Sequence, residues 1–300
     1  MWHVHAKDYI KAAKELGHEV CAVYDENREW SCSFAQTHGL SAVDSLEELL
    51  QSDIEGVIVC SATNRHTEDI ISIAEAKKHI FTEKVLALSV EDCDKIADAV
   101  NKNGVNFVIS MPFKSYGAVI AAKKVLDSGE LGAVRYFRFR NVHNGSTADW
   151  LPPHFYSKEQ CGGGAMIDLG AHGMYVTDWF LGGTPDSYAS QFTDCTGRGV
   201  EDNAVTVMAY KNGAIAVNET GFVFSGTPRI IDIGGEKGRL HLSGDDIIKV
   251  VNGEQTTVAP EPNAQSPLSL FLSGGQSEQF GLAAARRLTE MMQGAYKGKV

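Results

Sequence analysis

Asp168 and His172 are the residues of this sequence best suited to proton transfer. They lie four positions apart in Gly163–Leu181, a segment predicted to be helical, and this spacing places both side chains on one face of the helix. A carboxylate beside an imidazole fixes the orientation of the ring and raises its basicity. The pair is therefore suited to removing a proton from an alcohol while hydride leaves the same carbon. The alternative is a capping aspartate beside a packed histidine.

Three glycines, Gly162–Gly164, precede this pair and would let the N-terminus of the helix approach a ligand closely. A metal site is not predicted, because no third ligand has a suitable spacing. His3 and His5 form an H-x-H pattern, which also occurs in metal-dependent hydrolases at the end of the first barrel strand. No strand precedes the pattern and no eightfold βα repeat follows it, which argues against such a barrel.

Glu83 and Lys84 follow the short segment Ile80–Thr82, which is predicted to be a strand. In open α/β sheets, ligands bind outside the carboxyl ends of the strands. A lysine at this position could hold a substrate hydroxyl and stabilise the charge that develops on its oxygen. Taken alone, such a lysine would more often be solvated on the surface.

Two further groups of polar residues follow predicted strands in the same way. Ser61–His66 come after the apolar strand Gly56–Cys60 and suit a loop that runs along the nicotinamide ribose of a bound dinucleotide. The alternative is that Thr63 or Asn64 simply caps a helix. Asp25 closes the strand Glu19–Tyr24 and could accept both ribose hydroxyls of the adenosine half, which favours NAD over NADP. Arg28 weakens that preference, and Asp25 could instead be the N-cap of the next helix.

The elements that must position these residues change in character at Pro112. Before it, short strands alternate with helices, which predicts an α/β fold with a parallel, doubly wound sheet over residues 1–112. After it, long β segments dominate and are joined by turns such as Asn212-Gly213 and Asn252-Gly253. Residues 113–300 are therefore predicted to form an α+β domain with a large, mostly antiparallel open sheet.

A first strand and a G-x-G-x-x-G turn, with which a dinucleotide-binding domain begins, are missing from the sequence. A helix is predicted almost at once, over His5–Leu16. We therefore expect a Rossmann-like domain truncated at its N-terminus, at the end of the phosphate loop. The alternative is a different α/β fold that starts with a helix.

The composition sets limits on the partners. Asp and Glu (38) outnumber Lys and Arg (27), and the formal net charge of −11 disfavours nucleic acid or an anionic membrane as the main partner. The six cysteines form no C-x-x-C pair and are expected to be reduced thiols of a cytoplasmic protein. The sequence has no signal peptide and no apolar segment long enough to span a bilayer.

Taken together, the motifs resemble those of the Gfo/Idh/MocA oxidoreductases, which include glucose–fructose oxidoreductase and inositol dehydrogenase. Glu83-Lys84 is similar to the E-K-P motif of that family, and Asp168–His172 to its D-x-G-x-H motif. Gly129–Val134 is similar to the step G-x-[IL]-G-x-[IV] into its second domain. Val85 departs from the family proline, which would stiffen the turn that aims the lysine, and the glycine loop is absent.

The resemblance implies that Lys84, Asp168 and His172 form the catalytic set, with NAD, or NADP, as cofactor. The predicted cofactor-binding residues are Trp2, Asp25, Arg28, Ser61, Thr63, Asn64, His66, Glu83 and Lys84. The predicted substrate-binding residues are Lys84, Lys114, Tyr116, His143, Trp150, His154, Asp168 and His172.

The function predicted from these motifs is reversible oxidation of a secondary alcohol on a sugar, sugar derivative or cyclitol, and the resemblance implies a homodimer or homotetramer. A second hypothesis is a non-catalytic fragment or pseudo-enzyme that binds a sugar or a partner subunit. A third is a glycoside hydrolase that works by transient oxidation with NAD.

Overall fold

The computed structural model describes residues 4–225 and 229–299, so Trp2 and His3 lie outside the described residues. The chain folds into two units. Unit 1 comprises residues 1–110 and 265–286, and unit 2 comprises residues 111–264 and 287–300. Each unit has its own sheet or sheets and its own apolar core.

Unit 1 contains only parallel strand pairs among its described residues, as the alternation of short strands and helices predicted. β1 (Ala22–Val23) pairs with β2 (Ser41–Ala42), and β4 (His79–Thr82) lies between β3 (Gly56–Val59) and β5 (Phe107–Ile109). Within the part of the chain that the structure describes, helix α1 precedes β1, and the two sets of strands share no hydrogen bonds.

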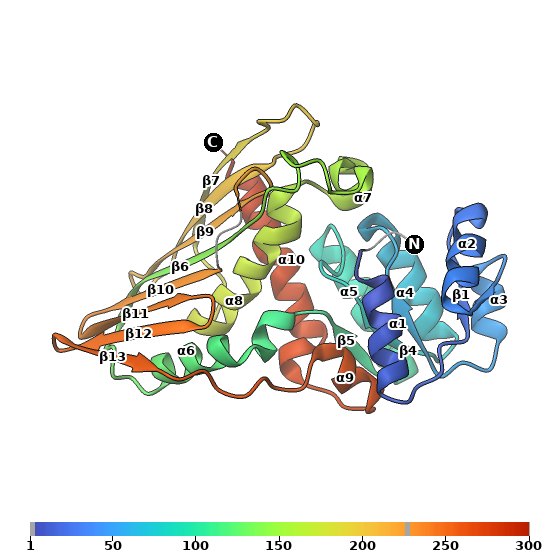
Figure 1. Cartoon of the computed structure of the whole chain (residues 1–300), viewed down its shortest axis with the longest axis horizontal. Coiled ribbons are helices and arrows are strands. Elements are labelled where there is room, and N and C mark those ends of the chain that lie inside the picture. Colours follow the sequence, from blue (N-terminus) through green and yellow to red (C-terminus); the bar gives the residue numbers. More distant parts are fainter. Residues whose placement is uncertain (1–3, 226–228, 300) are drawn as a thin grey trace. The chain divides into compact units, whose positions relative to one another are not determined.

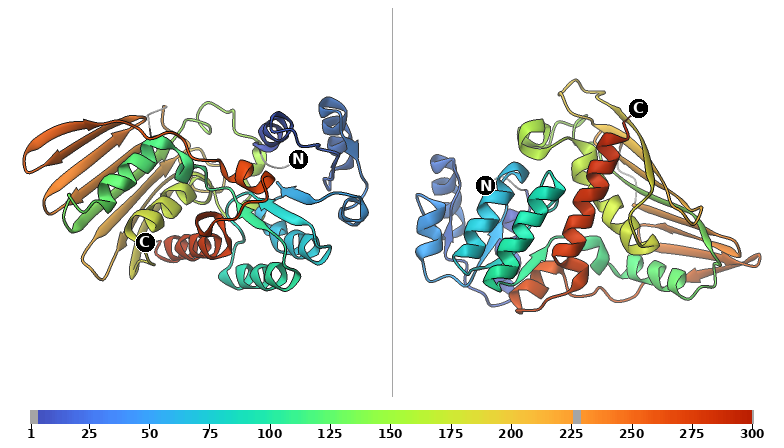
Figure 2. Two further views of the ribbon diagram at one scale, coloured as in Figure 1. Left: turned by 90° about the horizontal axis from the view of Figure 1, so that it is seen from below. Right: turned by 180° about the vertical axis from the view of Figure 1, so that it is seen from behind.

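Helices cover the three-stranded sheet of unit 1 on both faces (Figure 2). Phe81 of β4 contacts Tyr9 of α1 and Phe271 of α9, with ring centroids 5.1 and 5.9 Å apart. The other face is covered by α4, with α5 packed beside it. The helices of unit 1 are α1 (Ala6–Glu15), α2 (Arg28–His38), α3 (Leu46–Gln51), α4 (His66–Glu75), α5 (Val90–Asn103) and α9 (Pro267–Leu272).

The assignment of residues 113–300 to one domain differs from the structure in its C-terminal part. The division falls after Ser110, and residues 265–286 belong to unit 1. The reason is tertiary packing: Phe271 contacts Phe81, and the side-chain amide of Asn106 donates to the carbonyl of Gly275 at 3.1 Å. Helix α10 (Leu282–Lys297) contains the second division, after Arg286.

Unit 2 is built on one eight-stranded sheet in the order β13-β12-β11-β10-β6-β9-β8-β7 (Figure 1). All neighbours are antiparallel except β6 and β9, which confirms the predicted, mostly antiparallel sheet. The strands are β6 (Val134–Val142), β7 (Ser187–Thr193), β8 (Asn203–Ala209), β9 (Ile215–Gly221), β10 (Ile230–Gly235), β11 (Gly238–Ser243), β12 (Asp246–Val251) and β13 (Glu254–Val258).

Helices α6 (Gly117–Asp127) and α8 (Ala171–Leu181) cover one face of this sheet (Figure 1). Side chains alternate between the buried and the exposed face, so that Thr206 and Met208 are buried while Val205 and Val207 are exposed. The predicted turn between β12 and β13 places Asn252 and Gly253 at positive φ, 50° and 86°. Among the described residues, no helix combines the length and apolar character needed to cross a membrane.

Candidate active site

His172 lies in the first turn of α8 and is held by Tyr175 of the same helix. The Nδ1 atom of His172 is 2.8 Å from the hydroxyl oxygen of Tyr175. The Tyr175 hydroxyl also accepts a hydrogen bond from the backbone N–H of Phe113 at 3.1 Å. The Phe113 ring packs against the imidazole, with centroids 4.6 Å apart. The ring of His172 therefore has a defined orientation within unit 2.

Asp168 lies in a π-helical turn, Met166–Gly170, directly before α8. A π turn is rare and is often found at functional sites. Its backbone is tied to strand β9, because the side-chain amide of Asn218 donates to the Gly170 carbonyl at 2.7 Å and the hydroxyl of Thr220 donates to the Ala165 carbonyl at 3.2 Å. Strand β9 thus fixes the turn that carries Asp168 and leads into His172.

Two of the three glycines before this turn use their N–H groups within the chain, since Gly162 donates to the Lys158 carbonyl and Gly164 to Glu201, and the approach of a ligand to this segment stays a prediction. The Glu201 carboxylate accepts the N–H groups of Gly164 and Met166 at 2.8 and 3.1 Å. A Cβ on Gly163 would lie 2.0 Å from the Tyr296 hydroxyl, and one on Gly164 would lie 2.1 Å from the Glu201 carbonyl. Glycine is needed at positions 163 and 164 because the Tyr296 side chain and the Glu201 backbone leave no room for a Cβ atom.

His143 follows β6 directly, and the charge of Asp168 acts on its imidazole. Burial lowers the pKa of His143, and the nearby charge of Asp168 opposes this effect. The His143 ring stacks on Phe222 at 4.9 Å and contacts Trp150 at 4.7 Å. Its Nδ1 accepts the N–H of Gly145 at 3.0 Å, which leaves the Nε2 position for the proton of the neutral ring.

The other predicted substrate-binding residues of unit 2 fall into two places. Lys114 and Tyr116 follow Phe113 closely in the chain, Lys114 within the 3₁₀ turn Pro112–Ser115 and Tyr116 directly after it. Burial lowers the pKa of Lys114 to about 8. His154 lies in the 3₁₀ turn Pro153–Tyr156, with its ring 4.8 Å from that of Phe155. Phe155 belongs to the apolar cluster that also contains Phe222, Leu151 and Ala165. His154 thus lies beside the apolar cluster on which His143 stacks through Phe222.

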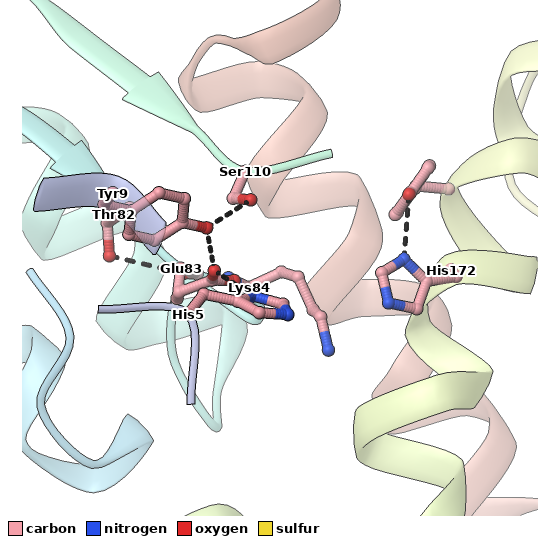
Figure 3. Close-up of polar contacts among 8 residues, drawn as sticks. His5, Tyr9, Thr82, Glu83, Lys84, Ser110 and His172 are labelled. Carbon is pink, nitrogen blue, oxygen red and sulfur yellow. Dashed lines mark hydrogen bonds and ion pairs between the residues drawn. The ribbon is translucent and has the colours of Figure 1, made fainter. Parts of the chain in front are cut away.

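In unit 1, Glu83 is the centre of a buried polar network (Figure 3). Its carboxylate accepts hydrogen bonds from the Tyr9 hydroxyl and from the backbone N–H of Lys84, and it pairs with the His5 ring at 2.9 Å. The Tyr9 hydroxyl also lies 3.1 Å from the Ser110 hydroxyl. These contacts tie α1 to the carboxyl ends of β4 and β5. A cofactor contact of Glu83 remains a prediction.

Lys84 follows β4, and the loop that continues from it is held by His66. The His66 ring is buried, with Nδ1 3.1 Å from the carbonyls of both Val85 and Leu86 and Nε2 3.2 Å from that of Ser61. The Lys84–Val85 peptide bond is cis. His66 therefore links the ends of β3 and β4, and its predicted cofactor contact is untested. Thr63 and the exposed Asn64 open the short 3₁₀ turn after β3.

Asp25 follows β1, and its carboxylate accepts the N–H of Asn27 at 2.9 Å. The N-cap of α2 is Asn27, whose side chain accepts the N–H of Trp30, so Asp25 is not the cap. Arg28 pairs with Asp44 at 2.7 Å and donates to the carbonyl of Val43. The carboxyl ends of the parallel strands of unit 1 are thus followed by four polar residues: Asp25, Ser61, Lys84 and Ser110.

Sequence reasoning missed four residues that shape these sites. Tyr175 and Glu201 act in unit 2, and Tyr9 and Ser110 act in unit 1. Tyr175 could have been found, because a residue three positions after His172 lies on the same helix face. No group of three His, Cys, Asp or Glu residues that could hold a metal occurs within residues 4–225 and 229–299.

Comparisons with known proteins match both halves of the chain. A family model described as "Oxidoreductase family, NAD-binding Rossmann fold" matches residues 2–111, and one described as "GFO/IDH/MocA C-terminal domain" matches residues 119–241. An uncharacterized oxidoreductase of Streptococcus pneumoniae is 28% identical over 236 residues, covering 76% of this chain and 63% of its own length. Myo-inositol 2-dehydrogenase of Thermotoga maritima is 29% identical over 213 residues, covering 66% and 59%.

Similarity to solved structures extends over nearly the whole chain. A levoglucosan dehydrogenase in complex with NADH and levoglucosan superposes with a TM-score of 0.83 at 16% identity, covering 99% of this chain and 95% of the other. At that identity the likeness concerns the fold. The matched curated sequences align over only about three fifths of their own length, 63% and 59% for the two relatives above.

Proposed function

Because this chain belongs to the Gfo/Idh/MocA family of oxidoreductases, we propose that it transfers hydride reversibly between NAD and a secondary alcohol of a sugar, sugar derivative or cyclitol. The relatives support this substrate class, since they include a myo-inositol dehydrogenase and a levoglucosan dehydrogenase. The observation that carries the proposal is the position of Asp168 on a fixed π turn directly before helix α8, whose first turn carries the oriented imidazole of His172.

The residues of unit 1 fit a dinucleotide at the carboxyl ends of its parallel strands. The Asp25 carboxylate suits the hydroxyls of the adenosine ribose, and the exposed Asn64 with Thr63 suits the nicotinamide ribose. The N-cap residue of α1, His5, makes no side-chain capping hydrogen bond, so the backbone N–H groups of the first turn suit a diphosphate. Arg28 is paired with Asp44, so it is poorly placed for a 2′-phosphate, which favours NAD over NADP.

NAD, when bound, accepts the hydride at its nicotinamide ring. In the proposed mechanism, His172 takes the hydroxyl proton at its Nε2 atom, since Nδ1 is engaged by Tyr175. Asp168 supports the positive charge that the imidazole then gains. Lys84 donates a hydrogen bond to the reacting oxygen and stabilises its developing negative charge. Lys114, Tyr116, His143, Trp150 and His154 are proposed to contact the substrate.

The direct test combines kinetics with cofactor binding. His172→Ala should lower turnover by about 100-fold or more, because a general base contributes on the order of 10² to 10⁴ to the rate. NADH affinity, measured by fluorescence titration, should stay within about twofold, because His172 is not among the proposed cofactor contacts. The exposed His18→Ala is the matched control and should change neither quantity. Normal turnover of His172→Ala would refute the catalytic role.

The second hypothesis is a non-catalytic fragment or pseudo-enzyme that binds a sugar or a partner subunit. NADH titration separates it from the enzyme hypothesis. The titration is repeated with a chain extended upstream by a strand and a glycine-rich turn. Binding by either chain favours a dehydrogenase, and absence of binding by both favours the non-catalytic reading. Product analysis identifies a glycoside hydrolase, which would cleave substrate without net reduction of NAD.

We further propose that the protein forms homodimers or homotetramers through the exposed face of the unit 2 sheet. Apolar side chains on this face include Tyr136, Val205, Val207, Ile215 and Ile248, each at least 36% exposed. Val207→Lys should then shift the mass measured by light scattering toward the monomer. The cysteines are free thiols, which agrees with a reducing cytoplasmic location.

A further inference from the structure

Arg229, which directly precedes strand β10, is a half-buried cation packed between two aromatic rings of unit 2. Its guanidinium carbon lies 4.3 Å from the centroid of the Phe113 ring and 4.9 Å from that of the Tyr116 ring. Burial lowers the pKa of Arg229 from its usual value, and the nearby groups Tyr116, Tyr175 and Asp245 oppose this effect. The guanidinium is therefore partly shielded from water, and its Nε atom is buried.

One buried hydrogen-bonding group of Arg229, its Nε–H, is not satisfied by this packing. A guanidinium has five N–H donors, and an aromatic face satisfies none of them well. The Nε atom is buried and has no hydrogen-bond partner, and the structure gives Arg229 no ion pair within the described residues. A buried N–H donor of a cation that lacks a partner costs free energy unless an acceptor, such as an anion, joins it.

Arg198 of the same unit is an arginine that has both an aromatic contact and an ion pair. Its guanidinium carbon lies 4.5 Å from the Tyr156 ring centroid, and its Nη2 atom pairs with Asp149 at 2.7 Å. The pairing raises the pKa of Arg198, whereas the pKa of Arg229 is lowered. Arg229 has the aromatic packing of Arg198 without the carboxylate.

We propose that Arg229 binds an anionic group of the substrate, so that the enzyme acts on an acidic sugar or cyclitol that carries a carboxylate or a phosphate. The planar guanidinium matches either group through two parallel hydrogen bonds. The chain carries a formal net charge of −11, which repels anions in general, so recognition of an anion needs a local cation of this kind.

The position of Arg229 relates the anion to the reacting centre. The Phe113 ring contacts the guanidinium on one part of its surface and the His172 imidazole on another, at 4.3 and 4.6 Å. These two distances place the guanidinium carbon at most 8.9 Å from the centroid of the imidazole, so an acidic sugar bound through Arg229 is long enough to reach the proposed general base. Calling this anion part of the substrate rests on the proposed function, whereas its binding to Arg229 does not.

The test measures binding and turnover for matched pairs of neutral and acidic sugars, using the full chain with and without NADH. The pairs are D-glucose with D-glucuronate, D-glucose with D-gluconate, and D-glucose with D-glucose 6-phosphate. Calorimetry should show at least one acidic member bound about 10-fold or more tightly than glucose, since charge-assisted hydrogen bonds contribute roughly 1.5–3 kcal/mol. The uronate and gluconate arms identify a carboxylate, and the phosphate arm identifies a phosphate.

Arg229→Gln should abolish this preference, while Arg229→Lys, which keeps the charge but not the planar fork, should reduce it by about 10-fold. Lys211→Gln is the control for net charge, because this lysine is 92% exposed on a hairpin, and it should keep the preference. Folding is verified by circular dichroism. If Arg229→Gln does not fold, the wild-type preference and its reduction in Arg229→Lys decide the matter.

Two results would overturn the inference: no acidic member binding more tightly than glucose, or the preference persisting in the folded Arg229 variants. Failure of the proposed function has a different signature. In that case neither NADH binding nor oxidation of any sugar is observed, while the acidic preference of the wild-type chain and its loss in Arg229→Gln still hold.

Discussion

The Nδ1 atom of His172 and the hydroxyl oxygen of Tyr175 lie 2.8 Å apart within helix α8. The same hydroxyl accepts the backbone N–H of Phe113, so its position is fixed from a second direction. A hydrogen bond on one ring nitrogen determines which tautomer an imidazole adopts and how the ring is oriented. Tyr175 is therefore a positioning residue for the proposed general base.

Replacing Tyr175 with phenylalanine should affect catalysis and stability together. We expect kcat to fall about 10-fold or more, because the His172 ring loses its fixed orientation, while the KM for NADH stays within about twofold. The free energy of unfolding should fall by about 1–3 kcal/mol, because the Phe113 N–H loses its acceptor. Steady-state kinetics and urea unfolding measure these effects.

Tyr188→Phe is the matched control, because the Tyr188 hydroxyl is buried and has no hydrogen-bond partner among the described residues. Its kcat should equal that of the wild type, and its stability should not fall. If Tyr175→Phe loses stability but keeps its kcat, Tyr175 is structural only and the positioning role is refuted.

Tyr9→Phe tests the network that ties α1 to the strand ends of unit 1. Burial and the charge of Glu83 raise the pKa of Tyr9, so the hydroxyl stays protonated and donates to the carboxylate. Loss of a hydrogen bond to a buried charge should lower the free energy of unfolding by roughly 1.5–3 kcal/mol in urea titrations. Tyr24→Phe removes a hydroxyl for which the described residues provide no partner, and a loss of equal size there would contradict the prediction.

Much of the fold could be predicted because its signals are local. Alternating short strands and helices indicated the parallel sheets of unit 1, and Asn252-Gly253 indicated the turn that joins β12 to β13. The return of residues 265–286 to unit 1 could not be predicted. It depends on Phe271 reaching Phe81, a contact between distant segments that no local pattern encodes.

The residues of the candidate site also divide into those that local sequence predicts and those that tertiary packing places. Asp168 and His172 share a short segment, so their spacing could be interpreted from the sequence. Glu201 and Arg229 come from loops whose approach is set by the packing of the sheet, so their roles were not predicted. Gly163 and Gly164 were predicted to lie close to a ligand. Their close contact with the segment around Glu201 could not be predicted, because that segment is remote in sequence.

His66 should make the stability of the protein sensitive to acid. Burial lowers its pKa below the usual 6.5, although backbone carbonyls and the charge of Asp69 oppose the shift. The unfolded chain then binds more protons than the folded chain below about pH 6.5, so the free energy of unfolding falls as the pH decreases. The lowered pKa of His143 acts in the same direction.

Urea unfolding between about pH 7 and pH 5 measures this dependence. Each such histidine contributes a slope of at most about 1.4 kcal/mol per pH unit. His66→Gln should show a clearly smaller decrease than the wild type, and the exposed His18→Gln should keep the wild-type decrease. Identical pH profiles for His66→Gln and wild type would show that His66 does not titrate as proposed.

Lys114 should titrate near neutral pH, beside the aromatic groups of the candidate site. Its Nζ atom lies 5.8 Å from the centroid of the Tyr175 ring, and burial lowers its pKa to about 8. The charge of Asp178 opposes the shift and that of Arg287 adds to it. In a chain labelled with ¹³C at the lysine Cε atoms, one resonance should therefore titrate at about pH 8, and it should be absent in Lys114→Met.

The same shift has a consequence for stability. Between about pH 8 and 10.5 the folded chain binds fewer protons at Lys114 than the unfolded chain, so this residue makes the free energy of unfolding rise with pH across that interval. Lys114→Met should lose this rise, whereas Lys211→Met, at an exposed lysine, should keep it. A spectrum in which every lysine titrates above pH 10 would contradict the low pKa and the buried ammonium group on which it depends.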